Sequence, residues 1–125
     1  MKVLIIDDDR DIRTVARLSL SLVGAMDVIE ASSGRDGVRM ALVEQPDVIL
    51  LDMMMPGMDG LATLAALRAQ PVNAKTPVIL LTAKAAAIDM KRLAALGAAG
   101  LLIKPFDPRT LADRVRALAR AHTVS

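Results

Sequence analysis

The sequence predicts an α/β fold in which five strands form one doubly wound parallel sheet with helices on both faces. Short runs rich in Val, Ile and Leu alternate along the chain with longer segments whose apolar residues recur at helical spacing. The short runs are almost continuously apolar, as in strands that are buried on both faces. Strands that alternate with helices in this way favour a parallel sheet built from crossover connections.

The predicted strands share their length and their content of branched apolar residues. In order along the chain they are Lys2–Ile6, Asp27–Ala31, Asp47–Leu51, Pro77–Thr82 and Gly100–Lys104. We expect them in the order 2-1-3-4-5, which is the flavodoxin-like form of the doubly wound sheet.

The predicted helices fill the intervals between these strands. They cover residues 10–22, 34–44, 59–69, 85–96 and 108–121. In the last of them Leu111, Val115 and Leu118 fall on one face, and arginines occupy the others. Each strand is therefore followed by one helix, so the pattern accounts for the whole chain.

The length of 125 residues corresponds to one domain. We assign residues 1–121 to it and residues 122–125 to a short C-terminal tail. A chain of this size buries roughly two-thirds of its unfolded surface, which is enough for a core without disulfides. No apolar run approaches the ~20 residues of a membrane span, and there is no secretory segment. We therefore expect a cytoplasmic protein that does not contact membranes.

Composition excludes several kinds of site. The chain has no cysteine, so disulfides, thiolate zinc sites and cysteine nucleophiles are absent. Its only histidine, His122, lies in the polar tail, which disfavours multi-histidine metal sites and a Ser-His-Asp triad.

The charge is unevenly distributed. Residues 1–60 carry six Lys/Arg and eleven Asp/Glu, a balance of −5, and residues 61–125 carry ten and three, a balance of +7. The basic residues are spread over several helices, and Phe106 is the only aromatic residue. With no dense basic run and no stacking platform, we expect no direct binding of nucleic acid.

Polar residues gather at the ends of the predicted strands. In open α/β sheets, functional groups collect at the carboxyl ends of the strands. The residues found there are Asp7 and Asp8 after the first strand, Asp52 after the third, Thr82 after the fourth and Lys104 after the fifth. The expected strand order places the first and third strands side by side, so the three acids should share one pocket.

Three neighbouring carboxylates need compensation. Two unit charges ~5 Å apart repel by about 3 kcal/mol at an effective dielectric constant near 20. A bound cation or an added proton relieves this repulsion. A site with only oxygen ligands and room for water suits Mg²⁺, which in turn attracts phosphate oxygens. One carboxylate then remains as a nucleophile that can form an aspartyl phosphate, with Thr82 and Lys104 beside it to contact the phosphoryl group.

Four motifs carry a family resemblance. The segments IIDDDRDIR, LLDMMMPGMDG, PVILLTA and GAAGLLIKPF occur in this order and lie at matching strand ends. Together they resemble the receiver domains of bacterial two-component response regulators, and the chain is similar to a single-domain receiver of the chemotaxis-regulator kind. The resemblance covers essentially the whole chain.

The resemblance implies a role for each acid. Asp52 resembles the phosphoacceptor. Asp8 resembles a direct Mg²⁺ ligand, together with Asp52 and the backbone carbonyl of Met54. Asp7 resembles the second acid, which reaches the metal through water. Asp9 has no such role, and we expect it to cap the helix that begins near Arg10.

The resemblance also implies a switch. Thr82 and Lys104 resemble the pair that contacts the phosphoryl group and relays its presence, and the bond between Lys104 and Pro105 would be cis. A sensor histidine kinase or histidine phosphotransfer protein would supply the phosphoryl group. The face formed by the fourth helix, fifth strand and fifth helix would then change its binding to a downstream protein, and a phosphorylation-dependent dimer is a further expectation.

Three positions depart from the family pattern. Leu101 stands where the family often has Tyr or Phe, so the usual aromatic rotation cannot occur and we expect a smaller response there. Met54 and Lys84 each lie two positions beyond a site residue, where polar residues can position the attacking water. Met54 cannot do so, and Lys84 could instead cover the phosphoryl group. We therefore expect a long-lived acyl phosphate.

Other interpretations remain open. An aspartyl-nucleophile phosphatase would usually need a second acid two residues after the nucleophile, where Met54 stands. A receiver-like module that only binds Mg²⁺ or a partner is a third option, although all five site residues are present. We expect no enzymatic activity beyond self-phosphorylation and slow self-dephosphorylation. The four methionines between Met53 and Met58 are interpreted as gap-filling residues rather than a soft-metal site.

Overall fold

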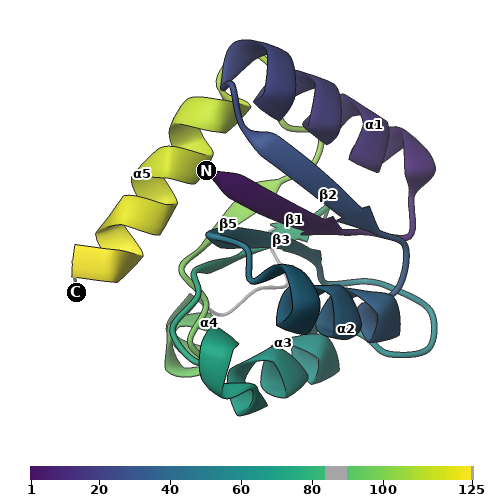
Figure 1. The fold of residues 1–125 in the computed structure, drawn as a ribbon, viewed down its shortest axis with the longest axis vertical. Coiled ribbons are helices and arrows are strands. Elements are labelled where there is room, and N and C mark those ends of the chain that lie inside the picture. The colour runs from purple at the N-terminus through teal and green to yellow at the C-terminus, as the bar shows by residue number, and fades with distance from the viewer. Residues whose placement is uncertain (84–89, 125) are drawn as a thin grey trace.

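The computed structural model describes residues 1–83 and 90–124. Five parallel strands form one sheet in the order β2-β1-β3-β4-β5, which confirms the predicted fold class and strand order (Figure 1). The strands are β1 (Lys2–Ile6), β2 (Asp27–Ala31), β3 (Val48–Asp52), β4 (Val78–Thr82) and β5 (Gly100–Ile103). They match the predicted runs to within one residue at each end.

Helices connect these strands. They are α1 (Arg10–Leu18), α2 (Gly34–Glu44), α3 (Gly60–Ala69), α4 (Met90–Ala95) and α5 (Leu111–Val124), with a π-helical segment η1 (Ser19–Val23) and a 3₁₀ turn η2 (Pro71–Asn73). None of the helices in the described part of the chain is long and apolar enough to cross a membrane.

Two helices differ from their predicted extent. The helix predicted over 10–22 is α-helical only to Leu18, because the chain widens into η1 where it packs on the start of α5 and the Ser19 hydroxyl donates to the carbonyl of Pro108. The helix predicted from residue 108 begins at Leu111, after a turn over residues 108–110 in which the Asp107 carbonyl accepts the amide of Thr110. It continues to Val124, and residues 85–89 of the predicted fourth helix lie outside the described residues.

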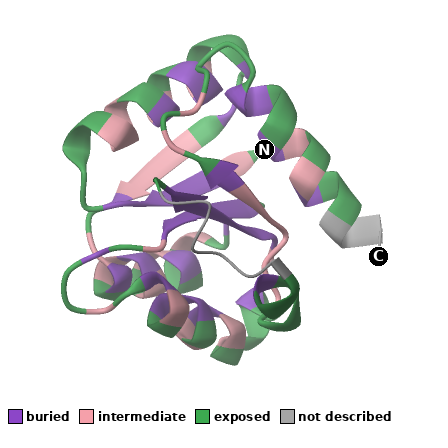
Figure 2. Cartoon of the chain, turned by 180° about the vertical axis from the view of Figure 1, so that it is seen from behind, coloured by how far each residue is buried: buried purple, intermediate pink, exposed green. Residues whose placement is uncertain are grey.

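The sheet separates two apolar clusters (Figure 2). Val3 and Ile5 of β1 face the cluster that α1 and α5 cover, whereas Leu4 and Ile6 face the cluster under α2, α3 and α4. Strands β3 and β4 are buried along their whole length. This burial on both faces explains why their sequences are apolar without alternation.

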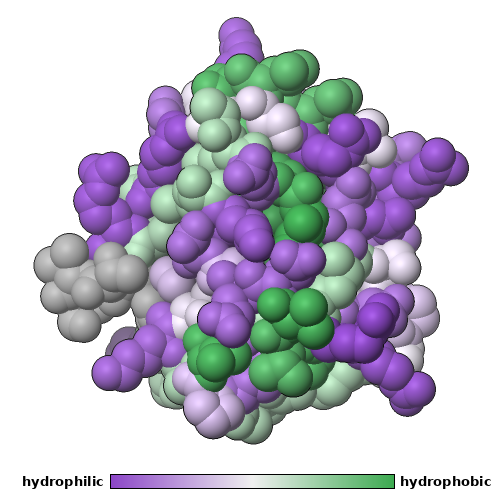
Figure 3. Space-filling view, viewed as in Figure 1, coloured by the Kyte–Doolittle hydropathy of each residue, from purple (hydrophilic) through white to green (hydrophobic). Residues whose placement is uncertain are grey.

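One apolar region remains at the surface. Leu18, Leu22 and Val23 are exposed where α1 passes into η1, and hydrophobic residues gather near the top of the molecule in Figure 3. Within η1, Ser19 and Leu20 are buried, whereas Leu22 and Val23 are exposed.

The loop after β3 is closed tightly around a glycine. A Cβ atom at Gly60, the first residue of α3, would lie 2.5 Å from the Cα atom of Met53, so only glycine fits without a shift. The Gly60 amide donates to the Met53 carbonyl at 3.1 Å. This contact holds the start of α3 against the end of β3 and thereby limits where Asp52 can lie.

Candidate functional site

A pocket of about 250 Å³ opens at the carboxyl ends of the strands. Residues from the ends of β1, β3, β4 and β5 form its lining, which consists of Asp7, Asp8, Asp9, Asp52, Met54, Ala83 and Lys104. The parallel arrangement brings these ends to one edge of the sheet, as strand order 2-1-3-4-5 requires.

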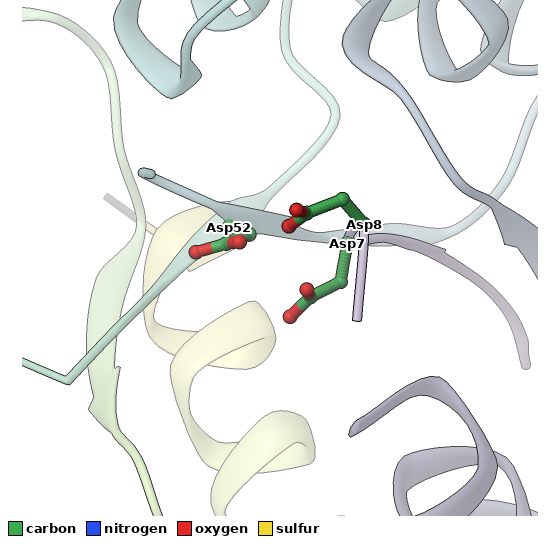
Figure 4. A group of neighbouring side chains, drawn as sticks. All are labelled: Asp7, Asp8 and Asp52. Carbon is green, nitrogen blue, oxygen red and sulfur yellow. The ribbon is translucent and has the colours of Figure 1, made fainter. Parts of the chain in front are cut away.

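Three carboxylates meet in this pocket. One oxygen each from Asp7, Asp8 and Asp52 can be chosen so that all lie within 4.8 Å of one another. Asp7 is fully buried and Asp52 is 4% exposed, whereas Asp8 is exposed. Figure 4 shows the carboxylates of Asp7 and Asp8 turned toward the side on which Asp52 lies. The cluster therefore has a buried base and an open mouth.

Lys104 bridges the two buried acids. Its Nζ atom lies 2.7 Å from Oδ2 of Asp7 and 3.3 Å from Oδ1 of Asp52. Burial alone would lower the pKa of Lys104, but the hydrogen bond and the charge of Asp7, together with Asp52, outweigh burial and raise it. Lys104 is therefore a fixed positive charge within the pocket.

Asp7 is held on every side. Its Oδ1 accepts the amide of Asp9 at 2.9 Å, and its Oδ2 accepts Lys104. Its backbone carbonyl accepts Nη1 of Arg13 at 2.8 Å, and its own amide donates to the carbonyl of Ala31 at 3.1 Å. With one hydrogen bond to each carboxylate oxygen and no exposed surface, Asp7 is placed as an anchor under the other two acids.

Asp52 and Asp8 keep oxygens available. Oδ1 of Asp52 accepts the Met54 amide at 3.2 Å in addition to Lys104, and no hydrogen bond to its Oδ2 is seen within residues 1–83 and 90–124. The carboxylate of Asp8 makes no hydrogen bond to any residue in the same described ranges. These oxygens are the ones from which a bound cation or phosphoryl group could be reached.

The environment of Asp52 disfavours its negative charge. The pKa of Asp52 is raised from 3.8 to about 6, chiefly because burial removes water from the carboxylate. The Met54 amide opposes this rise, the charge of Asp7 adds to it, and Lys104 opposes it again.

The donor set fits a hard divalent cation. Three carboxylates and one ammonium leave two negative charges, which one divalent ion balances. The ligands are oxygens, one of the acids is exposed, and the pocket has room for water, all of which suit Mg²⁺. The acidic cluster predicted from the strand ends is thus assembled in a form that could hold a metal ion.

The remaining predicted residues lie around this cluster. Thr82 ends β4 and is buried, and its neighbour Ala83, which the sequence did not single out, lines the pocket in its place. Leu101 is half-buried on β5 and packs with the cluster under α2, α3 and α4. The peptide bond between Lys104 and Pro105 is cis. Lys84 lies outside the described residues.

Two smaller expectations have different outcomes. Asp9 caps α1, since its Oδ1 accepts the amide of Asp11 at 2.9 Å, which confirms its role as a helix cap. The interpretation of the methionines as gap-filling residues is correct for Met55, which is buried, and wrong for Met54, a residue that is 68% exposed and lines the pocket. Met54 follows the last residue of β3 by two positions, where the chain has already left the core.

Comparison with known proteins identifies the family. The model of the response regulator receiver domain matches residues 3–116. The chain belongs to this family. Receiver domains are generally signalling modules rather than enzymes, and histidine kinases generally phosphorylate them. The pocket of Asp7, Asp8 and Asp52 is typical of receiver phosphoacceptor sites.

Several relatives illustrate the similarity. The chain is 37% identical over 124 residues to the alkaline phosphatase synthesis transcriptional regulatory protein PhoP of Bacillus subtilis, covering 99% of this chain and 50% of that protein. It is 37% identical over 125 residues to the nitrate/nitrite response regulator protein homolog of Haemophilus influenzae, covering 99% and 59%. This receiver chain thus spans about half the length of the curated relatives that it matches.

A solved structure shares the fold of the receiver. The chemotaxis response regulator CheY4 of Vibrio cholerae superposes with a TM-score of 0.86 and 33% sequence identity, covering 94% of this chain and 97% of that one. The likeness extends over nearly the complete length of both chains.

We predict that Asp52→Asn stabilises the receiver at neutral pH in the absence of divalent metal. Because folding raises the pKa of Asp52 to about 6, the wild type loses stability as the pH rises from the ordinary value of 3.8 through that point. An uncharged Asn avoids this loss, so we expect a gain of about 1–3 kcal/mol at neutral pH and none in acid. Urea unfolding, followed by far-UV circular dichroism at several pH values, measures this difference in the free energy of unfolding.

The control is Asp59→Asn at the exposed cap of α3, where Asn caps as well as Asp and no comparable gain is expected. Equal stability of wild type and Asp52→Asn at neutral pH would show that burial does not strain this carboxylate.

Proposed function

We propose that this receiver is a phosphoacceptor switch in which a phosphoryl group passes from a phosphohistidine to Asp52. The observation that carries the proposal is the convergence of three carboxylates on one pocket with Lys104 bridging two of them. Family membership supports it. The donor would be a sensor histidine kinase or a histidine phosphotransfer protein.

The reaction is a displacement at phosphorus. A carboxylate oxygen of Asp52 forms the new O–P bond while the P–N bond to the donor histidine breaks, and the electron pair returns to the imidazole. Asp8, Asp52 and the backbone carbonyl of Met54 would hold Mg²⁺, with Asp7 acting through water. When bound, the ion neutralises the phosphoryl oxygens and the carboxylates together.

Lys104 supplies the second positive charge. Its ammonium lies 3.3 Å from Oδ1 of Asp52, so it can contact a phosphoryl group on that carboxylate with a small change of rotamer. Its raised pKa keeps it charged at neutral pH. Nζ of Lys104 also donates to Oδ2 of Asp7 at 2.7 Å, which keeps the ammonium in the pocket.

The switch begins at the end of β4. Thr82 is buried and does not line the pocket, so its hydroxyl must move to reach a phosphoryl group on Asp52. Movement of Thr82 shifts the loop after β4, and Leu101 on the adjoining β5 pairs with Leu80 in the same ladder. Phosphorylation then shifts the population of the α4–β5–α5 face in proportion to its differential interaction with the two states.

The proposal extends to the wider setting of the receiver. We place the receiver in the cytoplasm, with a downstream protein target, a phosphorylation-dependent dimer as a further state, and no direct contact with nucleic acid or membrane. Because the curated relatives are about twice as long, the target could be a separate protein or another part of a longer regulator. A phosphatase is disfavoured because the thioether of Met54 cannot serve as the acid that such an enzyme needs.

Acetyl phosphate with Mg²⁺ should modify the protein once. We expect one addition of about 80 Da in intact-mass analysis, the mass of a phosphoryl group on a carboxylate, and none after chelation of the metal. Asp52→Asn should abolish the addition, and the matched variant Asp59→Asn should keep it. An adduct that survives in Asp52→Asn would contradict the assignment, and sustained turnover of phosphomonoesters would identify a phosphatase instead.

The acyl phosphate should persist well beyond a few seconds in Mg²⁺. Met54 lines the pocket but has no group that can orient an attacking water. Its replacement by Asn should shorten the half-life, whereas Met54→Leu, which stays apolar, should leave it unchanged. Decay is followed by intact mass after the donor is removed. A half-life of a few seconds in the unaltered protein would refute this.

A phosphoryl mimic should perturb the end of β4 more than β5. Thr82 must move to reach the mimic, whereas Leu101 has no ring to rotate and is already packed against the cluster under α2, α3 and α4. We expect large NMR shift changes at Thr82 and Ala83 and smaller ones at Leu101. A rearrangement that extends strongly across β5 would show that the switch does not need an aromatic residue.

A further inference from the structure

Arg13 links the acidic cluster to the edge of the sheet. It lies in the second turn of α1, and its side chain is only 15% exposed. Nη1 donates to the backbone carbonyl of Asp7 at 2.8 Å, and Nε donates to Oε1 of Glu30 on β2 at 3.3 Å. One guanidinium thus contacts the strand that ends in the acids and the strand beside it.

The sheet fixes Glu30 relative to the cluster. Glu30 pairs with Ile5 in the β1–β2 ladder. Just beyond this pair, the amide of Asp7 donates to the carbonyl of Ala31. Figure 1 shows α1 lying along β2 at this edge. These contacts form a closed ring. It runs from the Asp7 carbonyl through Arg13 to Glu30, and returns along β2 and its hydrogen bonds to β1.

That carbonyl belongs to the peptide that joins Asp7 to Asp8. Because a peptide unit is planar, holding its oxygen sets the direction in which the chain enters Asp8. Asp7 has further restraints on its side chain, but the Asp8 carboxylate accepts no hydrogen bond within residues 1–83 and 90–124. The orientation of Asp8 toward the pocket therefore depends on its backbone.

We infer that Arg13 is a positioning residue for the metal site: oriented by Glu30, it holds the Asp7–Asp8 peptide so that Asp8 faces Asp52. The inference rests on the proposed function, because it concerns Mg²⁺ at the same site. Arginine suits the task, since its planar fork can contact a carboxylate and a carbonyl at once, whereas the single ammonium of a lysine cannot do so in the same geometry. Partners that orient metal ligands typically change metal affinity by about 10–100-fold when removed.

The chain contains a matched control. Arg17 lies one turn further along α1 and pairs with the other oxygen of Glu30, Nε to Oε2 at 3.1 Å. No hydrogen bond joins it to Asp7 in the described structure. Arg13→Gln and Arg17→Gln therefore each remove one positive charge and one salt bridge to Glu30. Only Arg13→Gln also removes the hydrogen bond to the Asp7 carbonyl.

Mg²⁺ titration without any phosphoryl donor tests the inference. The titration is followed by the amide NMR shifts of Asp8 and Asp9. We expect the Kd for Mg²⁺ to rise roughly tenfold in Arg13→Gln and less than twofold in Arg17→Gln. With acetyl phosphate, the Mg²⁺ concentration for half-maximal phosphorylation should rise by the same factor, while the rate at saturating Mg²⁺ stays within about twofold. A general loss of structure would lower that maximal rate as well.

Glu30→Gln provides the second variant, which keeps Arg13 in place but weakens its anchor. It should raise the Kd less than Arg13→Gln, and the double variant should be no worse than Arg13→Gln alone. If the Arg13 and Arg17 variants have equal Kd values for Mg²⁺, the positioning role is overturned. The proposed function stays intact in that case, provided that the wild type binds Mg²⁺ and is phosphorylated normally. A wild type that binds no Mg²⁺ would overturn both.

Discussion

Three carboxylates share one small pocket at the end of the sheet, and the ammonium of Lys104 contacts the two that are buried. Without this contact, Asp7 would be a charge removed from water with only an amide to stabilise it, at a cost of several kcal/mol. Lys104 comes from the far end of the chain, 97 residues away from Asp7. The sheet makes this contact possible, because the parallel strands β1, β3 and β5 all end at the same edge, where their residues line one pocket.

The apolar strands make this arrangement rigid. β3 and β4 are buried on both faces between the two clusters, so their register cannot slip without exposing apolar side chains. Asp52 is the last residue of β3 and is held at the boundary between this core and solvent. Its raised pKa reflects burial, which removes water from this carboxylate and makes its negative charge less favourable. The burial of the apolar core therefore offsets the cost of placing a carboxylate at its edge.

The site combines restrained and open parts. Asp7 is bonded through its side chain, its carbonyl and its amide, and Arg13 extends these restraints to β2. Asp8 and Met54 are exposed at the mouth, and Thr82 lies buried beside the pocket rather than in it. Such a division would suit the proposed switch, in which the anchored residues would keep the metal geometry while the others respond to the phosphoryl group.

The sequence alone determined the fold, the strand order and the convergence of Asp7, Asp8, Asp52 and Lys104, because apolar runs define the strands and parallel strands end at one edge. It also determined the cap formed by Asp9, which is a local interaction. Only the tertiary structure decided that Ala83 lines the pocket beside the buried Thr82, that Met54 is exposed, and that Arg13 joins Glu30 to the Asp7 carbonyl. Periodicity reports which face of an element is buried, whereas these contacts depend on side-chain rotamers and on distances between segments far apart in the chain.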